Sequence, residues 1–338
     1  MKKQKVLLSG VQTSGELHLG NYFGAIKQMV ELVNSGNYES YIFLADYHSM
    51  TTLIDKKERN NKILETAAAY LACGFNKKEV AIFKQSDVPL VTELTWILDT
   101  VTPLPMLFLA HAFKDKERDK ANEKKDVNIG LLNYPVLMAA DILIYGADIV
   151  PVGKDQEQHL EMTREIAGKY NRAYNTNTFK SPKAYSVKEL EVIPGIDGEK
   201  MSKSKGNAIA MFASDEEIKK KVMNIKTDSK APNEKKNPDE VLIYKIHKIF
   251  LNKKEDEALR QKFLNSDKNP YGYKEAKEEL LKTILSYFSE MKKKYNYYLN
   301  TPKGKKEMLS VLKSGSKRAN KKASLMLKKV RKETGLDF

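Results

Sequence analysis

Cysteine, tryptophan and long apolar runs are scarce in this 338-residue sequence, which contains one Cys and one Trp. The lone Cys73 cannot form a disulfide within the chain, so we expect a protein of a reducing compartment, the cytoplasm. The apolar run 135–140 is followed by Asp141 and is far shorter than the ~20 residues that a membrane span needs. The basic start at 1–5 precedes too few apolar residues for a signal peptide. We therefore expect no membrane partner.

Acidic residues are outnumbered by basic ones, 44 against 59, which gives a net charge of +15. Residues 301–338 contain twelve Lys or Arg and three acidic residues, a local excess of +9. Such an excess favours a polyanionic partner that binds through its phosphates. A solvated helix face would have the same composition, and the sequence alone leaves both interpretations open.

The length and the hydrophobic content of 41% predict two globular domains. In the first half, short apolar runs alternate with helical patterns, which is typical of βαβ units and a mostly parallel sheet. We expect strands at 6–9, 41–45, 80–83 and 149–152, and helices at 22–33, 57–73, 92–100, 129–140 and 155–170. The almost wholly charged stretch 114–126 indicates a solvent-facing insertion. Beyond residue 204 only helices are predicted, at 241–251, 273–294 and 303–332.

Two short motifs would suit a polyphosphate. Lys200-Met201-Ser202-Lys203-Ser204 places two cations in a loop, and His18-Leu19-Gly20-Asn21 lies where the first strand turns into a helix. The N–H groups and dipole of such a helix attract phosphates. Each motif alone is weak, because a basic loop is often only solvated and a histidine before a helix is often only a cap.

A third pattern lies in the helix predicted near 129–140. Tyr134, Met138 and Asp141 are spaced four and three residues apart, so they share one helical face. An aromatic ring, a thioether and one carboxylate would suit a flat, largely apolar ligand with a single hydrogen-bond donor. Ordinary core packing, with Asp141 ending the helix, is the alternative.

Taken together, the two phosphate motifs resemble the signatures of class I aminoacyl-tRNA synthetases. The lysine motif, known as KMSKS, matches in full, whereas Leu19 and Asn21 depart from the usual form of the first. The blocks 14–22, 137–143 and 150–156 resemble the tryptophanyl-tRNA synthetases in particular. The resemblance extends from about Val6 to Ser204, and residues 317–320 show a weaker similarity.

The resemblance implies an α/β fold, with a Rossmann-like parallel sheet in a catalytic domain at 1–204 and an all-helical C-terminal domain at 205–338 on the anticodon side of tRNA. It implies a tryptophan–tRNA ligase that forms tryptophanyl-adenylate and pyrophosphate from ATP, then transfers tryptophan to the 3′ end of tRNA(Trp). ATP would enter with Mg²⁺ held largely by the nucleotide and water. No protein metal site, no tightly bound cofactor and a homodimer are expected.

The family's site residues map onto this sequence as follows. Charge on the phosphates would be stabilised by His18, Asn21, Lys200 and Lys203. The other expected ATP contacts are Gln12, Thr13, Ser14, Gly20, Lys116, Gly153, Lys154, Asp155, Val192, Met201, Ser202 and Ser204, with Lys114 or Lys120 as alternatives to Lys116. Asp141 would accept the indole N–H and Gln156 would help to hold the α-ammonium group. The pocket would be lined by His48, Tyr134, Met138, Val150 and Val152.

Three other functions compete with this hypothesis. A tyrosyl-specific relative would share the fold and the reaction. A small-molecule adenylyltransferase would share the phosphate turn but would not need the basic helical C-terminus. A non-catalytic RNA-binding paralogue would gain nothing from an intact Lys200–Ser204 motif with Asp141 and Gln156.

Overall fold

The computed structural model of the chain describes residues 4–13, 16–109, 128–153, 156–186, 193–203 and 205–337. The charged stretch predicted at 114–126 lies outside these ranges. Within them, no helix is long and apolar enough to cross a lipid bilayer.

A five-stranded sheet forms the centre of the N-terminal half, in the order β3-β2-β1-β4-β5. All four pairings are parallel, and β1 and β2 are in register from Lys5 opposite Tyr38 to Val11 opposite Leu44. The strands are β1 (Lys5–Val11), β2 (Tyr38–Leu44), β3 (Val80–Lys84), β4 (Ile149–Val152) and β5 (Lys183–Ser186). The predicted parallel sheet is thus confirmed, and β5 is an additional strand that the sequence analysis missed.

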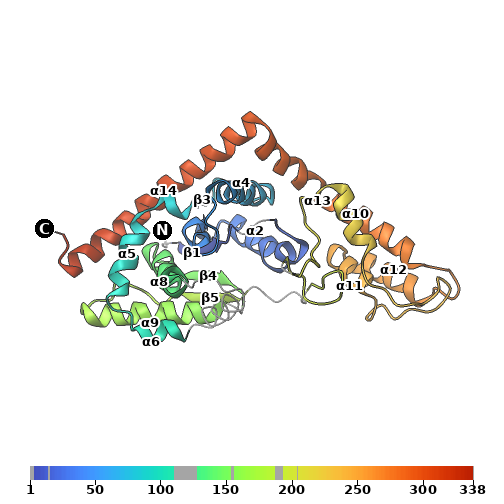
Figure 1. Ribbon diagram of the computed structural model, residues 1–338, viewed down its shortest axis with the longest axis horizontal. Helices are drawn as coiled ribbons and strands as arrows, with labels where there is room; N and C mark the ends of the chain where they lie inside the picture. The colour runs from blue at the N-terminus through green and yellow to red at the C-terminus, as the bar shows by residue number, and fades with distance from the viewer. Residues whose placement is uncertain are drawn as a thin grey trace.

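Helices cover both faces of this sheet (Figure 1). They are α1 (Leu19–Asn21), α2 (Lys27–Asn34), α3 (Asp46–Ser49), α4 (Lys56–Ala72), α5 (Leu90–Asp99), α6 (Leu104–Phe108), α8 (Ile129–Ile144) and α9 (Glu157–Ala173). The single helix predicted at 22–33 is wrong in detail, because a π-helical turn, Tyr22–Ile26, separates α1 from α2. Alternate residues of β1 point to the two faces, so Leu7 and Val11 belong to one core cluster and Val6 and Leu8 to the other.

Beyond residue 204 the described chain is helical, as predicted. The helices are α10 (Asp215–Met223), α11 (Leu242–His247), α12 (Lys253–Leu264), α13 (Tyr273–Asn300) and α14 (Pro302–Thr334). In Figure 1, α10 to α12 gather at one end, whereas α13 and α14 form an inverted V and α14 returns along β3 to the far end of the sheet. The basic segment 301–338 therefore packs on the sheet as well as on α13, and the domain boundary at residue 204 stays a prediction.

Candidate active site

The turn after β1 is organised by His18, the N-cap of α1. Its Nδ1 atom accepts a hydrogen bond from the Asn21 backbone N–H at 3.3 Å, and Asn21 Oδ1 accepts one from the His18 N–H at 3.1 Å. His18 therefore caps this helix, which is one of the two roles that the sequence left open for it. Burial lowers the pKa of His18, which favours the neutral ring. A neutral imidazole can donate a hydrogen bond to a phosphate from its free nitrogen.

The lysine loop is fixed at its base by Asn207, which is 2% exposed. Asn207 Nδ2 lies 2.9 Å from Asp197 Oδ1 and 3.2 Å from the Lys200 carbonyl oxygen, and its Oδ1 accepts from the Ser202 N–H at 2.8 Å. Lys200 and Lys203 themselves are exposed. The loop therefore has a rigid base and presents its cations to solvent.

The two motifs are in direct contact, although 180 residues separate them in the sequence. The Gly20 N–H donates to Met201 Sδ at 3.4 Å, and the Leu19 N–H donates to the Ile209 carbonyl oxygen at 3.1 Å. A Cβ atom at Gly20 would lie 3.0 Å from the His18 ring and 3.5 Å from Met201, so this close approach suits glycine. The structure therefore places the first motif against the second at Gly20 and Met201, and the role of these residues in phosphate binding stays a prediction.

The buried carboxylate of Asp141 lies on α8 with Tyr134 and Met138, and α8 continues to Ile144, so Asp141 does not end the helix. Gln85, 1% exposed, donates from Nε2 to Asp141 Oδ2 at 2.6 Å. In the part of the chain that the structure describes, Oδ1 receives no such bond. Burial raises the pKa of Asp141 well above its ordinary value, and the bond from Gln85 partly opposes this shift.

A series of side-chain contacts connects Gln12, one of the predicted ATP contacts, with Gln156, one of the predicted tryptophan contacts. Gln12 Nε2 lies 3.3 Å from His48 Nε2, and the His48 ring meets Tyr134 edge-on at 4.9 Å. The Tyr134 hydroxyl lies 2.9 Å from His159 Nε2, and His159 Nδ1 lies 3.1 Å from Gln156 Oε1. Because Gln156 Oε1 can only accept, Nδ1 of His159 is the donor in that contact.

The other predicted residues that the structure describes lie on or just after strands β1 and β4. Val150 and Val152 belong to β4, and Gly153 follows it. Thr13 follows β1 and is 1% exposed, and its buried hydroxyl has no hydrogen-bond partner among the described residues. Six predicted contacts lie outside the described residues: Ser14, Lys116, Lys154, Asp155, Val192 and Ser204.

Three residues that build the site were missed in the sequence analysis: Gln85, His159 and Asn207. Gln85 directly follows β3, and the rule that ligands bind beyond the carboxyl ends of parallel strands could have identified it. His159 lies one helical turn after Gln156, which is also a recognisable spacing. No signal in the sequence distinguishes Asn207 from an ordinary turn residue.

Comparisons with known proteins agree with this geometry. The family model described as tRNA synthetases class I (W and Y) matches residues 1–289. The tryptophan–tRNA ligase of Fusobacterium nucleatum is 45% identical over 97% of this chain and 97% of its own length. That of Campylobacter jejuni is 40% identical over 98% of this chain and 99% of its own.

Among solved structures, tryptophanyl-tRNA synthetase from Campylobacter jejuni, complexed with ADP and tryptophan, has a TM-score of 0.90 at 39% identity. The similarity covers 98% of this chain and 99% of that one. Fold, contacting motifs and family model together define a class I aminoacyl-tRNA synthetase. Within that class, the chain belongs to the tryptophan–tRNA ligase family.

Proposed function

We propose that this chain is an enzyme that joins L-tryptophan to tRNA(Trp) with the use of ATP. The observation that supports this most strongly is the buried Asp141, whose Oδ2 accepts from Gln85 and whose Oδ1 receives no such bond from the described residues. The indole ring has one N–H donor and no acceptor, so Oδ1 would satisfy it completely. Phenylalanine would leave this buried carboxylate oxygen without a partner, and the size of the pocket must reject tyrosine.

In the first step, the tryptophan carboxylate attacks the α-phosphorus of ATP in line, which forms tryptophanyl-adenylate and releases pyrophosphate. Lys200 and Lys203 stabilise the negative charge that develops on the leaving pyrophosphate. His18 and Asn21 hold the phosphates at the start of α1. Gln156 orients the α-ammonium group, so that the carboxylate faces the nucleotide.

In the second step, a ribose hydroxyl at the 3′ end of the tRNA attacks the carbonyl carbon of the mixed anhydride, and AMP leaves. Positioning and electrostatics suffice for both steps, without a protein nucleophile. Among the described residues, no group of three His, Cys, Asp or Glu side chains could hold a metal ion. We therefore propose that Mg²⁺ enters as part of the ATP substrate, ligated by phosphate oxygens and water.

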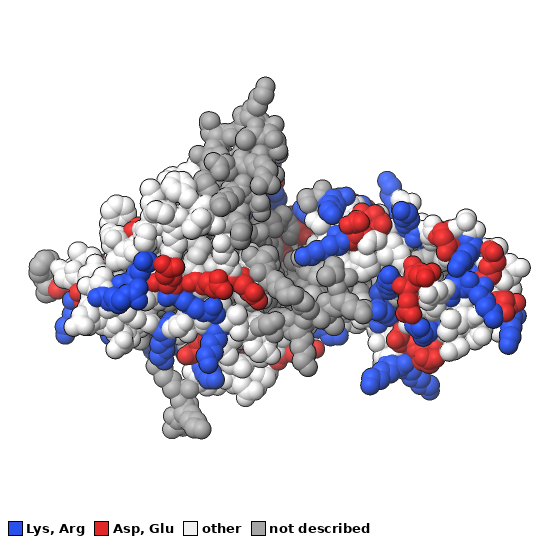
Figure 2. All heavy atoms as spheres, turned by 90° about the horizontal axis from the view of Figure 1, so that it is seen from below, with Lys and Arg blue, Asp and Glu red and all other residues white. Residues whose placement is uncertain are grey.

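For tRNA we propose contacts with the helical part, residues 205–338, on the anticodon side. On the face drawn in Figure 2, basic and acidic side chains are intermingled and form no continuous basic patch. Some basic residues of α14 bind the sheet domain instead, since Lys322 pairs with Glu39 at 2.6 Å and Arg331 with Glu93 at 2.6 Å. The exposed Lys317 is a better candidate for phosphate contact.

Charge reversal at Lys317 and Lys321, which is also exposed, should weaken tRNA binding and reduce the slope of log K against log salt by about 2, or about 1 per lysine. Charge reversal at Lys322 would also break the pair with Glu39, so that residue is unsuitable for the test. Equal salt slopes for the variant and the wild type would mean that these lysines are only solvated.

We further propose a homodimer in the cytoplasm. Neighbouring elements α5, α6 and the start of α8 expose large apolar side chains: Trp96 (73%), Leu104 (55%), Phe108 (47%) and Ile129 (76%). Grouped apolar side chains of this kind mark interfaces between proteins. A twofold dimer through this surface would cover Trp96, so its fluorescence should be blue-shifted at micromolar protein and change upon dilution.

The experiment that tests the function is the exchange of labelled pyrophosphate into ATP with each of the twenty amino acids. We expect exchange with tryptophan only. Exchange with tyrosine alone would indicate the tyrosyl-specific relative, and exchange with no amino acid would indicate an RNA-binding paralogue. Charging of tRNA(Trp) by the same preparation separates the ligase from a small-molecule adenylyltransferase.

A further inference from the structure

Helix α14 lies backbone to backbone against β3, the edge strand of the sheet. A Cβ atom at Gly315 would lie 2.0 Å from the Ile82 carbonyl oxygen, which leaves no room for any other residue at 315. Ala319 and Ala323, one and two turns further on, are fully buried. These contacts fix the position of α14 along the strand and cover an edge that would otherwise expose unpaired backbone groups.

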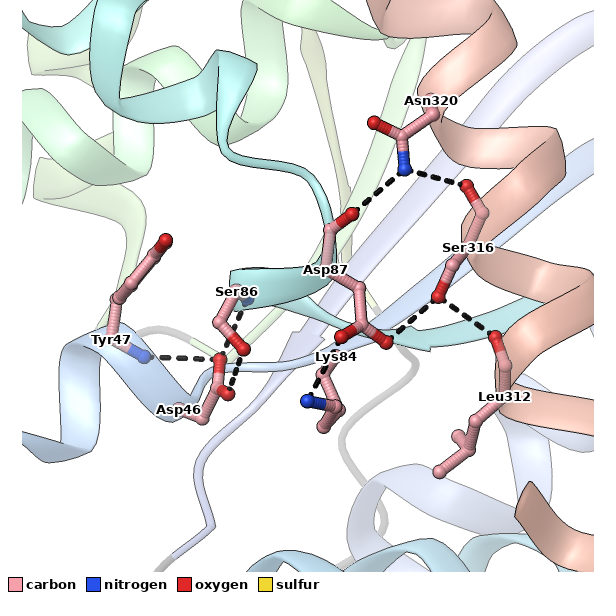
Figure 3. Close-up of polar contacts among 8 residues, drawn as sticks. All are labelled: Asp46, Tyr47, Lys84, Ser86, Asp87, Leu312, Ser316 and Asn320. Carbon is pink, nitrogen blue, oxygen red and sulfur yellow. Dashed lines mark hydrogen bonds and ion pairs between the residues drawn. The ribbon is translucent and has the colours of Figure 1, made fainter.

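Where β3 ends, two side chains of α14 hold Asp87 (Figure 3). Asn320 Nδ2 donates to the Asp87 carbonyl oxygen at 2.7 Å. Ser316 Oγ lies 2.8 Å from Asp87 Oδ2 and 2.9 Å from the Leu312 carbonyl oxygen, and its single proton is shared between them. Lys84 pairs with the other carboxylate oxygen at 2.8 Å. Both the backbone and the side chain of Asp87 are therefore fixed from α14.

The two preceding residues of this turn are held by other elements. Ser86 donates to the buried Asp46 at the start of α3 from its hydroxyl and, at 2.9 Å, from its backbone N–H (Figure 3). Gln85 donates to Asp141 at 2.6 Å and accepts from the His48 N–H at 3.3 Å. Three consecutive residues thus connect α14, α3 and the amino-acid pocket. Asp87 lies two residues from the amide that fixes Asp141, within the same turn.

We propose that Ser316 and Asn320 are positioning residues for tryptophan selection, acting through the turn at Gln85–Asp87. The inference rests on the proposed function, since it assigns to α14 a role in the amino-acid pocket of that enzyme. By holding Asp87, the two side chains keep the Gln85 amide on Asp141 Oδ2 and so keep Oδ1 directed to the indole. The nucleotide motifs lie on other segments and share no contact with Ser316 or Asn320 among the described residues.

The test compares steady-state pyrophosphate exchange of Asn320→Ala and Ser316→Ala with that of the wild type. Each variant should raise KM for tryptophan about threefold to tenfold, the effect of one hydrogen bond, and change KM for ATP less than about twofold. Ser316→Thr retains the hydroxyl and should restore KM for tryptophan. Ser324→Ala, at an exposed position of the same helix, is the matched control and should leave both constants unchanged.

A double-mutant cycle with Gln85→Ala separates positioning from general stability. If Asn320 acts through Gln85, then Asn320→Ala should raise KM for tryptophan no further in the Gln85→Ala background. Additive effects, an unchanged KM for tryptophan in both single variants, or equal rises in both KM values would overturn the proposal. Wild-type protein that does not exchange with tryptophan would instead refute the proposed function, so the two failures are distinguishable. If Asn320→Ala does not fold, the same double-mutant cycle can be measured with Ser316→Ala, which removes only one hydroxyl group.

Discussion

The amino-acid side and the nucleotide side of this site are built in opposite ways. Asp141 and Gln85 are 4% and 1% exposed, and each is bonded to a neighbour on another element. Lys200 and Lys203 are exposed on a loop whose base is held by Asn207. The two regions thus differ in whether their charged and polar groups are buried or exposed.

The difference matches the different task of each region. A buried carboxylate discriminates among ligands because a wrong ligand leaves it desolvated and unpaired, a penalty that exposed groups do not impose. Cations that act on a leaving pyrophosphate must be most effective in the transition state, when charge develops there. Selection should therefore depend on the buried side and rate on the exposed side.

The largest effect is expected from Asp141→Asn, which removes the buried charge of the amino-acid pocket. The amide can offer its oxygen to the indole but lacks the charge, and it places a donor group against Gln85. We expect a loss of roughly 2–4 kcal/mol in kcat/KM for tryptophan. Exchange kinetics at saturating ATP measure this loss. Unchanged kcat/KM would show that Asp141 is only structural.

Lys200→Ala and Lys203→Ala break the exposed side. Each should lower kcat for adenylate formation on the order of 10²-fold, as other preorganised charge stabilisers do, with little change in tryptophan affinity. Lys205→Ala is the matched control, since Lys205 is exposed in the same loop and is 3.9 Å from Glu199, a long distance for an ion pair. A rise in KM for tryptophan alone would contradict the assignment.

Asn207→Ala sharpens the comparison, because it alters the base of the loop and leaves both lysines in place. Losing its bonds to Ser202 and Lys200 should lower kcat about tenfold, as one or two buried hydrogen bonds would. Tryptophan affinity, measured by calorimetry, should stay the same. A parallel loss of tryptophan affinity would mean that the two regions are not separate.

The smallest effect concerns pH. Because the pKa of Asp141 is raised in the folded protein, tryptophan affinity should fall as pH decreases through that pKa, where the acceptor loses its charge. Stability should change in the opposite sense: folding takes up a proton, so this contribution is complete below the ordinary pKa and is lost as pH rises through the raised one. Asp141→Asn should abolish both dependences in titration calorimetry and thermal melts. Identical pH profiles for variant and wild type would contradict this assignment.

Local patterns in the sequence predicted four of the five strands, because their alternating apolar residues face two buried layers. They also predicted the motif at His18 and the helical face with Asp141. The sequence analysis missed Gln85 and Asn207 because their importance depends on hydrogen-bond partners that are 56 residues away for Gln85 and 5 to 10 residues away for Asn207. Likewise, the composition of 301–338 indicated a basic helix, but it did not indicate that this helix packs on β3 through Gly315.

The central claim, that selection and rate are set by separate regions, is tested most directly by combining Asp141→Asn with Lys200→Ala. Pyrophosphate-exchange kcat/KM for tryptophan is measured for the wild type, both single variants and the double variant. We predict that the two losses add to within about 0.5 kcal/mol, as expected for groups with no shared partner. A coupling energy of about 2 kcal/mol or more would contradict the account and show that Asp141 and Lys200 act as one unit.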